Sequence, residues 1–445
     1  MPESADTRQT YLSSYRQFGN SDAGRRHPWL RPLREDAIAR FEHRGFPTTR
    51  DEGWRHTNVA PIAKVPFKRA VHEFDGLTAS ELGSFTFGED DSCRLVFING
   101  QYSEELSSAC ALPAGTRARN LAAALETERE LIEPHLARLA SFQDNPFVAL
   151  NTAFLADGAF VYIPRRTVVE QVLHLIFLSS SRGEASVSYP RNLIVVEDDS
   201  QANIVESYGG LDHGTYFTDT VTEVALGSNA SLDHYKLQRE SENSFHVGTL
   251  QVLQEQSSRL YSHSISLGGA LVRNDLNAVM NGEGCDCTLN GLYVTRGRQL
   301  VDNHTCIDHA RPHCDSRELY KGILDDQSRG VFSGKIVVRK DAQKTNARQT
   351  NKNLLLSEEA LSNTAPELKI FADDVKCTHG ATIGHIDEEE LFYTRSRGIG
   401  AEAARTLLTY AFASDILGSV KFKPIQCQID LILLTRLSRG AKLRI

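Results

Sequence analysis

A weak internal repeat in the middle of the chain is the feature that most restricts its fold. From about residue 140 onward, short β-branched runs alternate with Gly, Asn, Asp and Ser. One row of same-parity positions recurs after 28, 28 and then 29 residues. The four rows are Ile194, Val196, Ser200, Ala202 and Ile204; Thr222, Val224, Ser228, Ala230 and Leu232; Leu250, Val252, Gln256, Ser258 and Leu260; and Val279, Asn281, Cys285, Cys287 and Leu289. A period of this length is typical of stacked solenoid coils.

The rows place large apolar residues on one face and small residues where a coil would turn. One coil cannot bury its own apolar face, so neighbouring coils must stack on it. The pattern therefore predicts a β-solenoid, and it leaves open a β-sandwich with evenly spaced strands.

Helical apolar spacing flanks the β-rich region on both sides. The expected helices span residues 11–18, 33–41, 122–139, 388–393, 404–416 and 425–437. Cys93–Ile98 is predicted to form a strand that ends at a turn. The last two helices have apolar faces that need cover, and we expect them to pack on each other and on the end of the solenoid.

These patterns divide the chain into three predicted domains. Residues 1–138 are expected to form a mixed α/β N-terminal domain, residues 139–386 the β-solenoid, and residues 387–445 a C-terminal helical domain. The length of 445 residues is sufficient for such a division and for a large core. The predicted fold class is therefore mainly β.

Charge and composition exclude several classes of function. A formal net charge of −8 argues against a nucleic-acid or anionic-membrane surface. No apolar run approaches the roughly 20 residues that span a bilayer, and the first residues are too acidic for a secretory signal. Eight cysteines are too few for a disulfide framework in a chain of this length. We therefore expect reduced thiols and a cytoplasmic location.

Signatures of nucleotide chemistry and of hydrolysis are absent from the sequence. Gly19 and Gly24 have the glycine spacing of a phosphate loop, but Arg25 and Arg26 stand where Lys and a hydroxyl residue are needed. No nucleophile elbow is present, and no dinucleotide fingerprint follows a predicted strand. We expect a chain that is not an enzyme and has no nucleotide site of its own.

Cys377 and His379 are the strongest candidates for a functional site. They lie two residues apart on a predicted strand, so both side chains point to the same face. A thiol beside an imidazole suits soft metals and sulfur, and Lys376 together with His379 is expected to favour the thiolate. The alternative is that a Cys and a His end a strand by chance.

Two further groups contain metal-binding residue types. Cys285 and Cys287 form a C-x-C pair, but Ser, Ala and Gln hold the corresponding positions of the repeat, so we expect buried packing residues. The second group consists of His304, Cys306, His309, His313 and Cys314. This group lacks the paired spacing of a zinc site. We expect chance neighbours or contacts at a subunit interface.

A β-solenoid can also be a carbohydrate-active lyase or hydrolase. That chemistry needs carboxylates or basic residues stacked in a groove. Asp198–Asp199 and Asp325–Asp326 are the candidates, and both pairs look like turn residues. The pattern therefore gives this alternative little support.

Several stretches of the sequence together resemble one known family. They are Gly45–Arg55, Ser316–Gly322, Phe332–Gly334, Asn353–Ser357, Pro366–Ile370, Lys376–Thr382, Leu391–Tyr393 and Ser396–Ile399. Read together they resemble the SufB/SufD family of iron–sulfur cluster assembly proteins, and Gly45–Arg55 looks like its SufD branch. The resemblance is closest over about residues 300–400.

This resemblance implies a fold and a set of partners. The family has a right-handed parallel β-helix core, flanked here by the two other predicted domains. Its members are non-catalytic scaffold subunits of the SUF system. The resemblance implies pairing with a SufB paralogue through the β-helix, docking of the SufC ATPase through the C-terminal helices, and a homodimer when the chain is alone.

The resemblance also implies a role for the candidate site. The family builds its clusters at the interface between the paired subunits, and the His and Cys of its motif correspond to His379 and Cys377. Thr378 stands where Ser is usual and keeps the hydroxyl. We expect these two residues to bind iron or a nascent iron–sulfur cluster shared with the partner. The alternative that only His379 is a ligand stays open. A SufB-type primary scaffold and a purely structural solenoid are the remaining alternatives.

Overall fold

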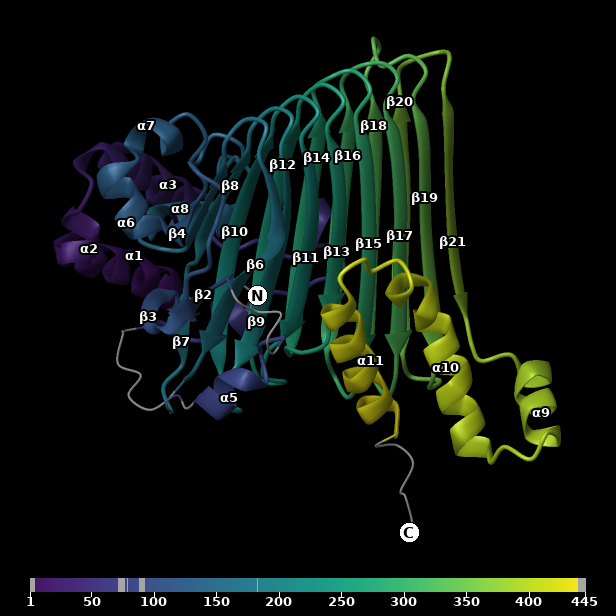
Figure 1. The fold of residues 1–445 in the computed structure, drawn as a ribbon. Helices are drawn as coiled ribbons and strands as arrows, with labels where there is room; N and C mark the ends of the chain where they lie inside the picture. Colours follow the sequence, from purple (N-terminus) through teal and green to yellow (C-terminus); the bar gives the residue numbers. More distant parts are fainter. Residues whose placement is uncertain (1–4, 71–76, 78, 88–92, 182, 439–445) are drawn as a thin grey trace.

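A parallel β-solenoid forms the centre of the protein, and this confirms the predicted fold class (Figure 1). The computed structural model describes residues 5–70, 77, 79–87, 93–181 and 183–438. Successive strands alternate between two sheets, so that each long strand pairs in parallel with the strand two positions further along the chain. This connectivity winds the chain into coils that stack along one axis.

The long strands fall into two sets, here named sheet A and sheet B. Sheet A contains β8 (Arg191–Val196), β10 (Tyr216–Leu226), β12 (Phe245–Gln254), β14 (Leu271–Met280), β16 (Leu300–His309), β18 (Arg329–Val338) and β20 (Leu361–Ile370). Sheet B contains β6 (Val168–Ser179), β9 (Gln201–Gly210), β11 (Ser231–Arg239), β13 (Arg259–Ser266), β15 (Asp286–Thr295), β17 (Asp315–Leu324), β19 (Asn346–Leu355) and β21 (Lys376–Gly384).

The coils differ in length, so a fixed period assigned some partners wrongly. Ile194 pairs with Val224 rather than with Thr222. Leu250 pairs with Leu276, a step of 26 residues, and not with Val279. The paired strands are similar in length, so the turns between them absorb the difference. Turn length is set by local backbone geometry, which a search for one period does not detect.

One corner of the solenoid has a left-handed backbone in successive coils and adjoins the small residues of the repeat. A residue with φ between 56° and 73° stands there in successive coils. These residues are Asp199, Asn229, Ser257, Gly284, His313 and Lys344. The backbone N–H of each donates to a carbonyl of the next coil, as from Asn229 to Gln256 at 2.8 Å. Asp, Asn and Gly tolerate this left-handed backbone best, and they hold three of the six positions.

The N-terminal part extends both sheets and covers their first coil. Its strands are β1 (Lys68–Arg69), β2 (Cys93–Ile98), β3 (Gln101–Ser108), β4 (Arg117–Asn120), β5 (Ala159–Ile163) and β7 (Ser186–Ser188). β2 pairs with β6 of sheet B, and β4 pairs with β5, which continues sheet A. The division of the chain at residues 138 and 386 stays a prediction.

The N-terminal helices pack on these strands through aromatic side chains. They are α1 (Ala5–Asn20), α2 (Asp22–Arg25), α3 (Arg31–Arg44), α4 (Ala60–Ala63), α5 (Ala79–Gly83), α6 (Leu121–Thr127), α7 (Arg129–Ile132) and α8 (Pro146–Ala153), with short 3₁₀ turns at Pro28–Leu30 and Glu52–Trp54. Tyr11, Phe41, Phe46 and Phe147 belong to one buried cluster. The helices predicted at 11–18 and 33–41 lie within α1 and α3.

The helix predicted at residues 122–139 is interrupted. α6 ends at Thr127, α7 ends at Ile132, and Ala137 has a φ of 56°. The buried carboxylate of Glu223 accepts the N–H groups of Ala137, Leu139 and Ala140 at 2.8–2.9 Å. This contact from a strand distant in sequence satisfies the backbone in place of helical hydrogen bonds, and apolar periodicity does not reveal it.

The C-terminal helices cover the flank of the solenoid and not its end, which corrects our expectation. They are α9 (Glu388–Ser396), α10 (Ala401–Leu417) and α11 (Lys423–Ser438). Ile416, Ile425 and Ile429 are buried against the outer face of sheet B, where Tyr235 and Ile265 contribute to the same cluster. Figure 1 shows α10 and α11 in front of these strands, with β21 left uncovered at the far edge. The last coil is therefore not closed by the chain's own helices.

The expectation of eight reduced thiols is wrong for one pair. Cys93 on β2 and Cys110, which follows β3, form a disulfide across a sequence separation of 17 residues. The antiparallel pairing of β2 with β3 brings the two side chains together. The spacing of the cysteines in the sequence did not reveal this disulfide. The cytoplasmic location stays a prediction. Among the described residues no helix is long and apolar enough to cross a bilayer.

We predict that Gly291→Ala destabilises the solenoid. A Cβ at Gly291 would lie 2.2 Å from the ring of Tyr320, a buried side chain that is 2% exposed. Overpacking of this kind costs about 1–3 kcal/mol. The midpoint of urea unfolding should fall for this variant. Gly384→Ala is the control, because no atom lies within 4 Å of its added Cβ; equal midpoints for the two variants would contradict the packing account.

Candidate functional site

Cys377 and His379 lie on β21, the last strand of sheet B. In the register with β19, Cys377 stands beside Ala347 and His379 stands beside Gln349. Ala347 and Gln349 are 2% and 1% exposed and belong to the inward-facing row of β19. Because paired residues of parallel strands point the same way, the thiol and the imidazole both face the axis of the solenoid.

The inward row of β21 is uncovered because no coil follows it. β21 pairs with β19 along one edge, and no strand of the described chain pairs along its other edge. Cys377 is half-buried against a small apolar cluster that includes Ala347 and Ala372, whereas His379 is exposed. The two donor atoms therefore stand at the mouth of the solenoid, where a further chain can approach them.

The Cys377 thiol is not activated by its neighbours, contrary to our expectation. Partial burial raises the pKa of Cys377, and a hydrogen bond from the backbone of Ala347 offsets this effect only in part. Lys376 is the preceding residue on the strand, so its side chain points to the opposite face. A cationic partner on the inward face, such as a bound iron ion, is needed to favour the thiolate.

A buried polar pair lies beneath the site and was missed by the sequence reasoning. Gln349, next to His379 in the register, donates from Nε2 to Oε2 of Glu318 in the coil below at 2.7 Å. Gly334 on sheet A leaves room for this amide, since a Cβ there would lie 2.2 Å from Nε2. The spacing of these residues could have revealed the pair, because Glu318, Gln349 and His379 stand one coil apart from each other.

Burial raises the pKa of Glu318 from 4.5 to about 7. Its carboxyl is 3% exposed, and the hydrogen bond from Gln349 compensates the loss of hydration only in part. Desolvation disfavours the charged form of a carboxyl group. Glu318 is therefore a buried acid that changes charge near neutral pH, and the side-chain amide of Gln349 lies between it and the coil of His379.

The five-residue His/Cys group is dispersed by the fold. His304 and Cys306 point outward from β16, and Nε2 of His304 pairs with Asp302 at 3.0 Å. His309 points inward and pairs with the hydroxyl of Ser316 at 2.9 Å. The two remaining residues are His313, a corner residue, and Cys314, which is buried. The residues follow one another in sequence, but the fold places them in different surroundings.

Cys285 and Cys287 are buried packing residues, as expected. They are 1% and 0% exposed and belong to the main core cluster. The neighbour of Cys285 is Cys314 of the next coil and not Cys287. A hydrogen bond with the Cys314 thiol lowers the pKa of Cys285 to about 7. Neither residue lies near β21.

The two acidic pairs are turn residues at different corners. The carboxylate of Asp198 accepts the N–H of Ser228 at 2.8 Å, and Asp199 has positive φ. The carboxylate of Asp326 accepts the N–H of Gly297 at 2.8 Å. Both pairs therefore hold turns, and they do not line a common groove.

Trp54 anchors the N-terminal part to the solenoid. It is 8% exposed, and the guanidinium carbon of Arg273 lies 4.0 Å from the centre of its ring. Arg273 also donates to the carbonyl of Gly53 at 2.7 Å and to Asp302 at 2.6 Å. The stretch Gly45–Arg55 is thus fixed to sheet A by packing and charge.

No group of three or more His, Cys, Asp or Glu residues in the described part of the chain can hold a metal ion. Cys377 and His379 supply two donors, one sulfur and one nitrogen, and both types suit iron. Iron in sulfur clusters is usually four-coordinate, so the remaining ligands must be sulfide or come from elsewhere. The pair fits one half of a shared site.

Two family models match nearly the whole chain. The first, described as the SufBD core domain of SUF system FeS cluster assembly, matches residues 177–412. The second, described as the SufBD protein N-terminal region, matches residues 5–175.

Curated relatives carry corresponding names. An iron–sulfur cluster assembly SufBD family protein of Synechocystis is 37% identical over 389 residues, which cover 86% of this chain and 85% of that protein. The iron–sulfur cluster assembly protein SufD of Escherichia coli is 29% identical over 413 residues, covering 92% and 94% of the two chains. SufD of Bacillus subtilis is 26% identical over 431 residues, covering 95% and 96%.

We predict that Glu318→Gln makes stability less dependent on pH. The folded-state pKa of about 7 lies above the ordinary value of 4.5, so the unaltered chain loses stability as pH rises between them. An amide carries no charge, so the variant should be more stable at pH 8, by up to about 3 kcal/mol. Urea unfolding at pH 8 and pH 4.5 measures this difference. A variant equally destabilised at both pH values would contradict the buried charge.

Proposed function

Because this chain belongs to the SufBD family of iron–sulfur cluster assembly proteins, and so has a role in the SUF system, we propose that it is the SufD-type, non-catalytic subunit of the assembly scaffold. It pairs with a SufB subunit and docks the SufC ATPase. The single observation that carries the proposal is the inward-facing Cys377–His379 pair on a strand whose outer edge has no partner in the described chain.

The end of the solenoid is the surface that pairs with SufB. β20 and β21 each have one free backbone edge within the described residues, and such edges accept a further strand. Large apolar side chains are exposed around them: Leu361 (49%), Ile370 (40%), Phe371 (64%) and Ile383 (46%). A second solenoid joined here satisfies the backbone groups and buries these side chains. In the absence of SufB a second copy of this chain takes the same place.

Cys377 and His379 then form one side of the assembly site. A strand joined to β21 places the partner's residues opposite the inward row, so that two chains contribute ligands to one iron–sulfur cluster. The cluster is the product that the complex builds and releases. A site divided between two chains opens when they separate, and it therefore holds its cluster less permanently than four cysteines of one chain.

The outer face of the C-terminal helices is the surface that docks SufC. Their inner face is buried on sheet B, but Leu407 of α10 (50%) and Leu431 (67%) and Leu434 (44%) of α11 are exposed. Apolar side chains that remain exposed after a helix has packed indicate a further partner.

The same helices are firmly attached to the solenoid. The Lys321 ammonium on β17, itself 3% exposed, contacts Asp415 of α10 at 2.5 Å, and Lys421 contacts Asp233 of β11 at 2.8 Å. A displacement of the helices is therefore transmitted to sheet B. In our proposal, ATP-driven dimerisation of SufC moves the helices, the end of the solenoid separates from SufB, and Cys377 and His379 become accessible to iron and sulfur.

We predict that His379→Ala reduces the cluster content of the complex. The imidazole is exposed and makes no hydrogen bond or ion pair with a described residue, so the chain should still fold and assemble. Iron and acid-labile sulfide in the co-expressed, purified complex should fall by at least about tenfold, the scale of losing a metal contact. His213→Ala is the control, because His213 lies exposed in the loop between β9 and β10. Unchanged iron and sulfide in an intact His379→Ala complex would refute the role.

We predict that the two partner surfaces can be disabled separately. Phe371→Glu places a charge in the end surface and should weaken SufB pairing by about 2 kcal/mol or more, while SufC still binds. Leu431→Glu should weaken SufC binding and spare SufB. Co-purification of all three proteins measures both effects, and each variant is the control for the other. Val168→Glu, at a 51% exposed position of β6, should affect neither. Loss of both partners in either variant would contradict the assignment.

A further inference from the structure

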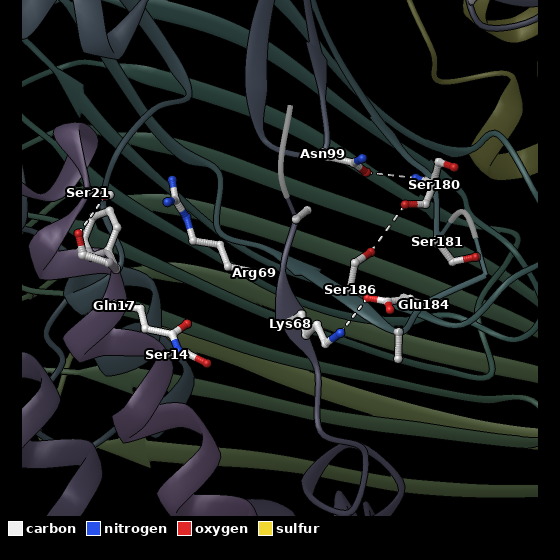
Figure 2. Close-up of a pocket in the computed structure, with 13 residues that line it drawn as sticks. Ser14, Gln17, Ser21, Lys68, Arg69, Asn99, Ser180, Ser181, Glu184 and Ser186 are labelled. Atoms are coloured by element: carbon white, nitrogen blue, oxygen red, sulfur yellow. Dashed lines mark hydrogen bonds and ion pairs between the residues drawn. The ribbon is translucent and has the colours of Figure 1, made fainter. Parts of the chain in front are cut away.

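A cavity between the N-terminal helices and the first coils has no role in the proposed function. It has a volume of about 530 Å³ and lies between α1 on one side and β1 with the segment before β7 on the other (Figure 2). That volume is within the range of small-molecule sites. Figure 1 shows α1 and β7 at the end of the solenoid opposite to β20 and β21, and α10 and α11 lie over later strands, so the cavity belongs to neither partner surface.

Arg69 is the unneutralised cation of this cavity. Its guanidinium makes no hydrogen bond or ion pair with any described residue; its close contact is the ring of Phe18, whose centre lies 4.7 Å away. Burial lowers the pKa of Arg69, because the guanidinium has lost contact with water and no described carboxylate replaces it. Figure 2 shows its side chain on the α1 side of the cavity, while Lys68 turns the opposite way.

A second guanidinium increases the positive potential. The guanidinium carbon of Arg34 lies 5.3 Å from the centre of the same Phe18 ring, and Arg34 is 3% exposed. It donates to backbone carbonyls, to Leu155 at 2.6 Å and to Gly24 at 2.9 Å, and not to a carboxylate. Arg69 further lowers the pKa of Arg34, as expected of two nearby cations.

The carboxylates that the structure describes around the cavity are already engaged elsewhere. Glu184 pairs with Lys68 at 2.8 Å. Asp212 accepts from the hydroxyl of Ser180 at 2.6 Å and from the backbone of Ser181 at 2.9 Å. Asp157, at the adjoining cavity, accepts the N–H of Ala122 at 3.0 Å. The positive charge of Arg69 is therefore left for a ligand.

Neutral donors face the cavity from both walls. Gln17 and Ser14 of α1 make no side-chain hydrogen bond within the described residues, and both line the cavity. On the opposite wall, Oδ1 of Asn99 accepts the N–H of Ser180 at 2.9 Å, which leaves its amide NH₂ as a donor. Figure 2 shows Arg69, Gln17 and Ser14 on the α1 side of the cavity and Asn99 on the opposite side, so donors stand on both walls.

We propose that this cavity binds a small molecule through a phosphate group, with Arg69 as the principal contact. Arg donates two parallel hydrogen bonds to an oxyanion. A tetrahedral phosphate has oxygens outside the plane of the guanidinium, which stay available to further donors of the cavity, whereas a planar carboxylate accepts in one plane. The cavity is much larger than phosphate alone, so the group is carried on a larger molecule. The Gly19–Gly24 stretch borders the site only through Ser21 and forms no phosphate loop.

Calorimetric titration of the full-length chain tests this proposal with inorganic phosphate, pyrophosphate and malonate as probes. Phosphate and pyrophosphate should bind saturably and malonate should not. Arg69→Gln should weaken phosphate binding by at least about tenfold, the scale of a charged hydrogen bond. Arg259→Gln, an exposed arginine on the outer face of β13, should leave binding unchanged.

Arg69→Lys keeps the charge and loses the planar fork, and it serves as the second variant if Arg69→Gln does not fold. It should bind phosphate more weakly than the unaltered chain while unfolding at a similar temperature. The absence of saturable phosphate binding, preference for malonate, or phosphate binding that is unchanged in a folded Arg69 variant would each overturn the proposal. None of these outcomes bears on the role of His379.

Discussion

Backbone hydrogen bonding between parallel coils is the constraint on which this structure depends. Each strand of the solenoid satisfies its N–H and C=O groups through the coil before it and the coil after it, so every end of the stack leaves one edge open. At the first end, β2 and β4 extend the two sheets and the N-terminal helices pack over them. At the other end, β20 and β21 have no such cover within the described residues. Within the described residues, the first end of the solenoid is covered and the last end is open.

The candidate site follows from this asymmetry. In every earlier coil the inward row of sheet B is buried, and it combines apolar side chains such as Leu232 with polar ones such as Glu318 and Gln349. Cys377 and His379 continue that row where burial stops. The same positions that pack the core elsewhere therefore present a thiol and an imidazole to whatever joins the open end. Placing the C-terminal helices on the flank keeps that end free.

The sequence predicted what depends on local pattern. The solenoid, the strand at Cys93–Ile98, the buried stripe of Ile425, Ile429 and Leu433, and the packing role of Cys285 and Cys287 could all be predicted from spacing or residue type. Contacts between distant segments could not. Four features depend on which residues the coils bring together: the hydrogen bonds of Glu223 to the backbone near Ala137, the Cys93–Cys110 disulfide, the unequal coils and the Gln349–Glu318 pair. The same limit applies to Arg69, whose lack of an anionic partner appears only once its surroundings are known.

The central claim is that the imidazole of His379 binds iron at a site shared between two chains. Electron–nuclear double resonance measures it directly, with [15N]histidine in this subunit alone and an unlabelled SufB partner, on the reduced cluster of the complex. The account predicts a 15N hyperfine coupling of the size expected for an iron-bound imidazole. A cluster without any 15N coupling, in a complex that contains both chains, would contradict it.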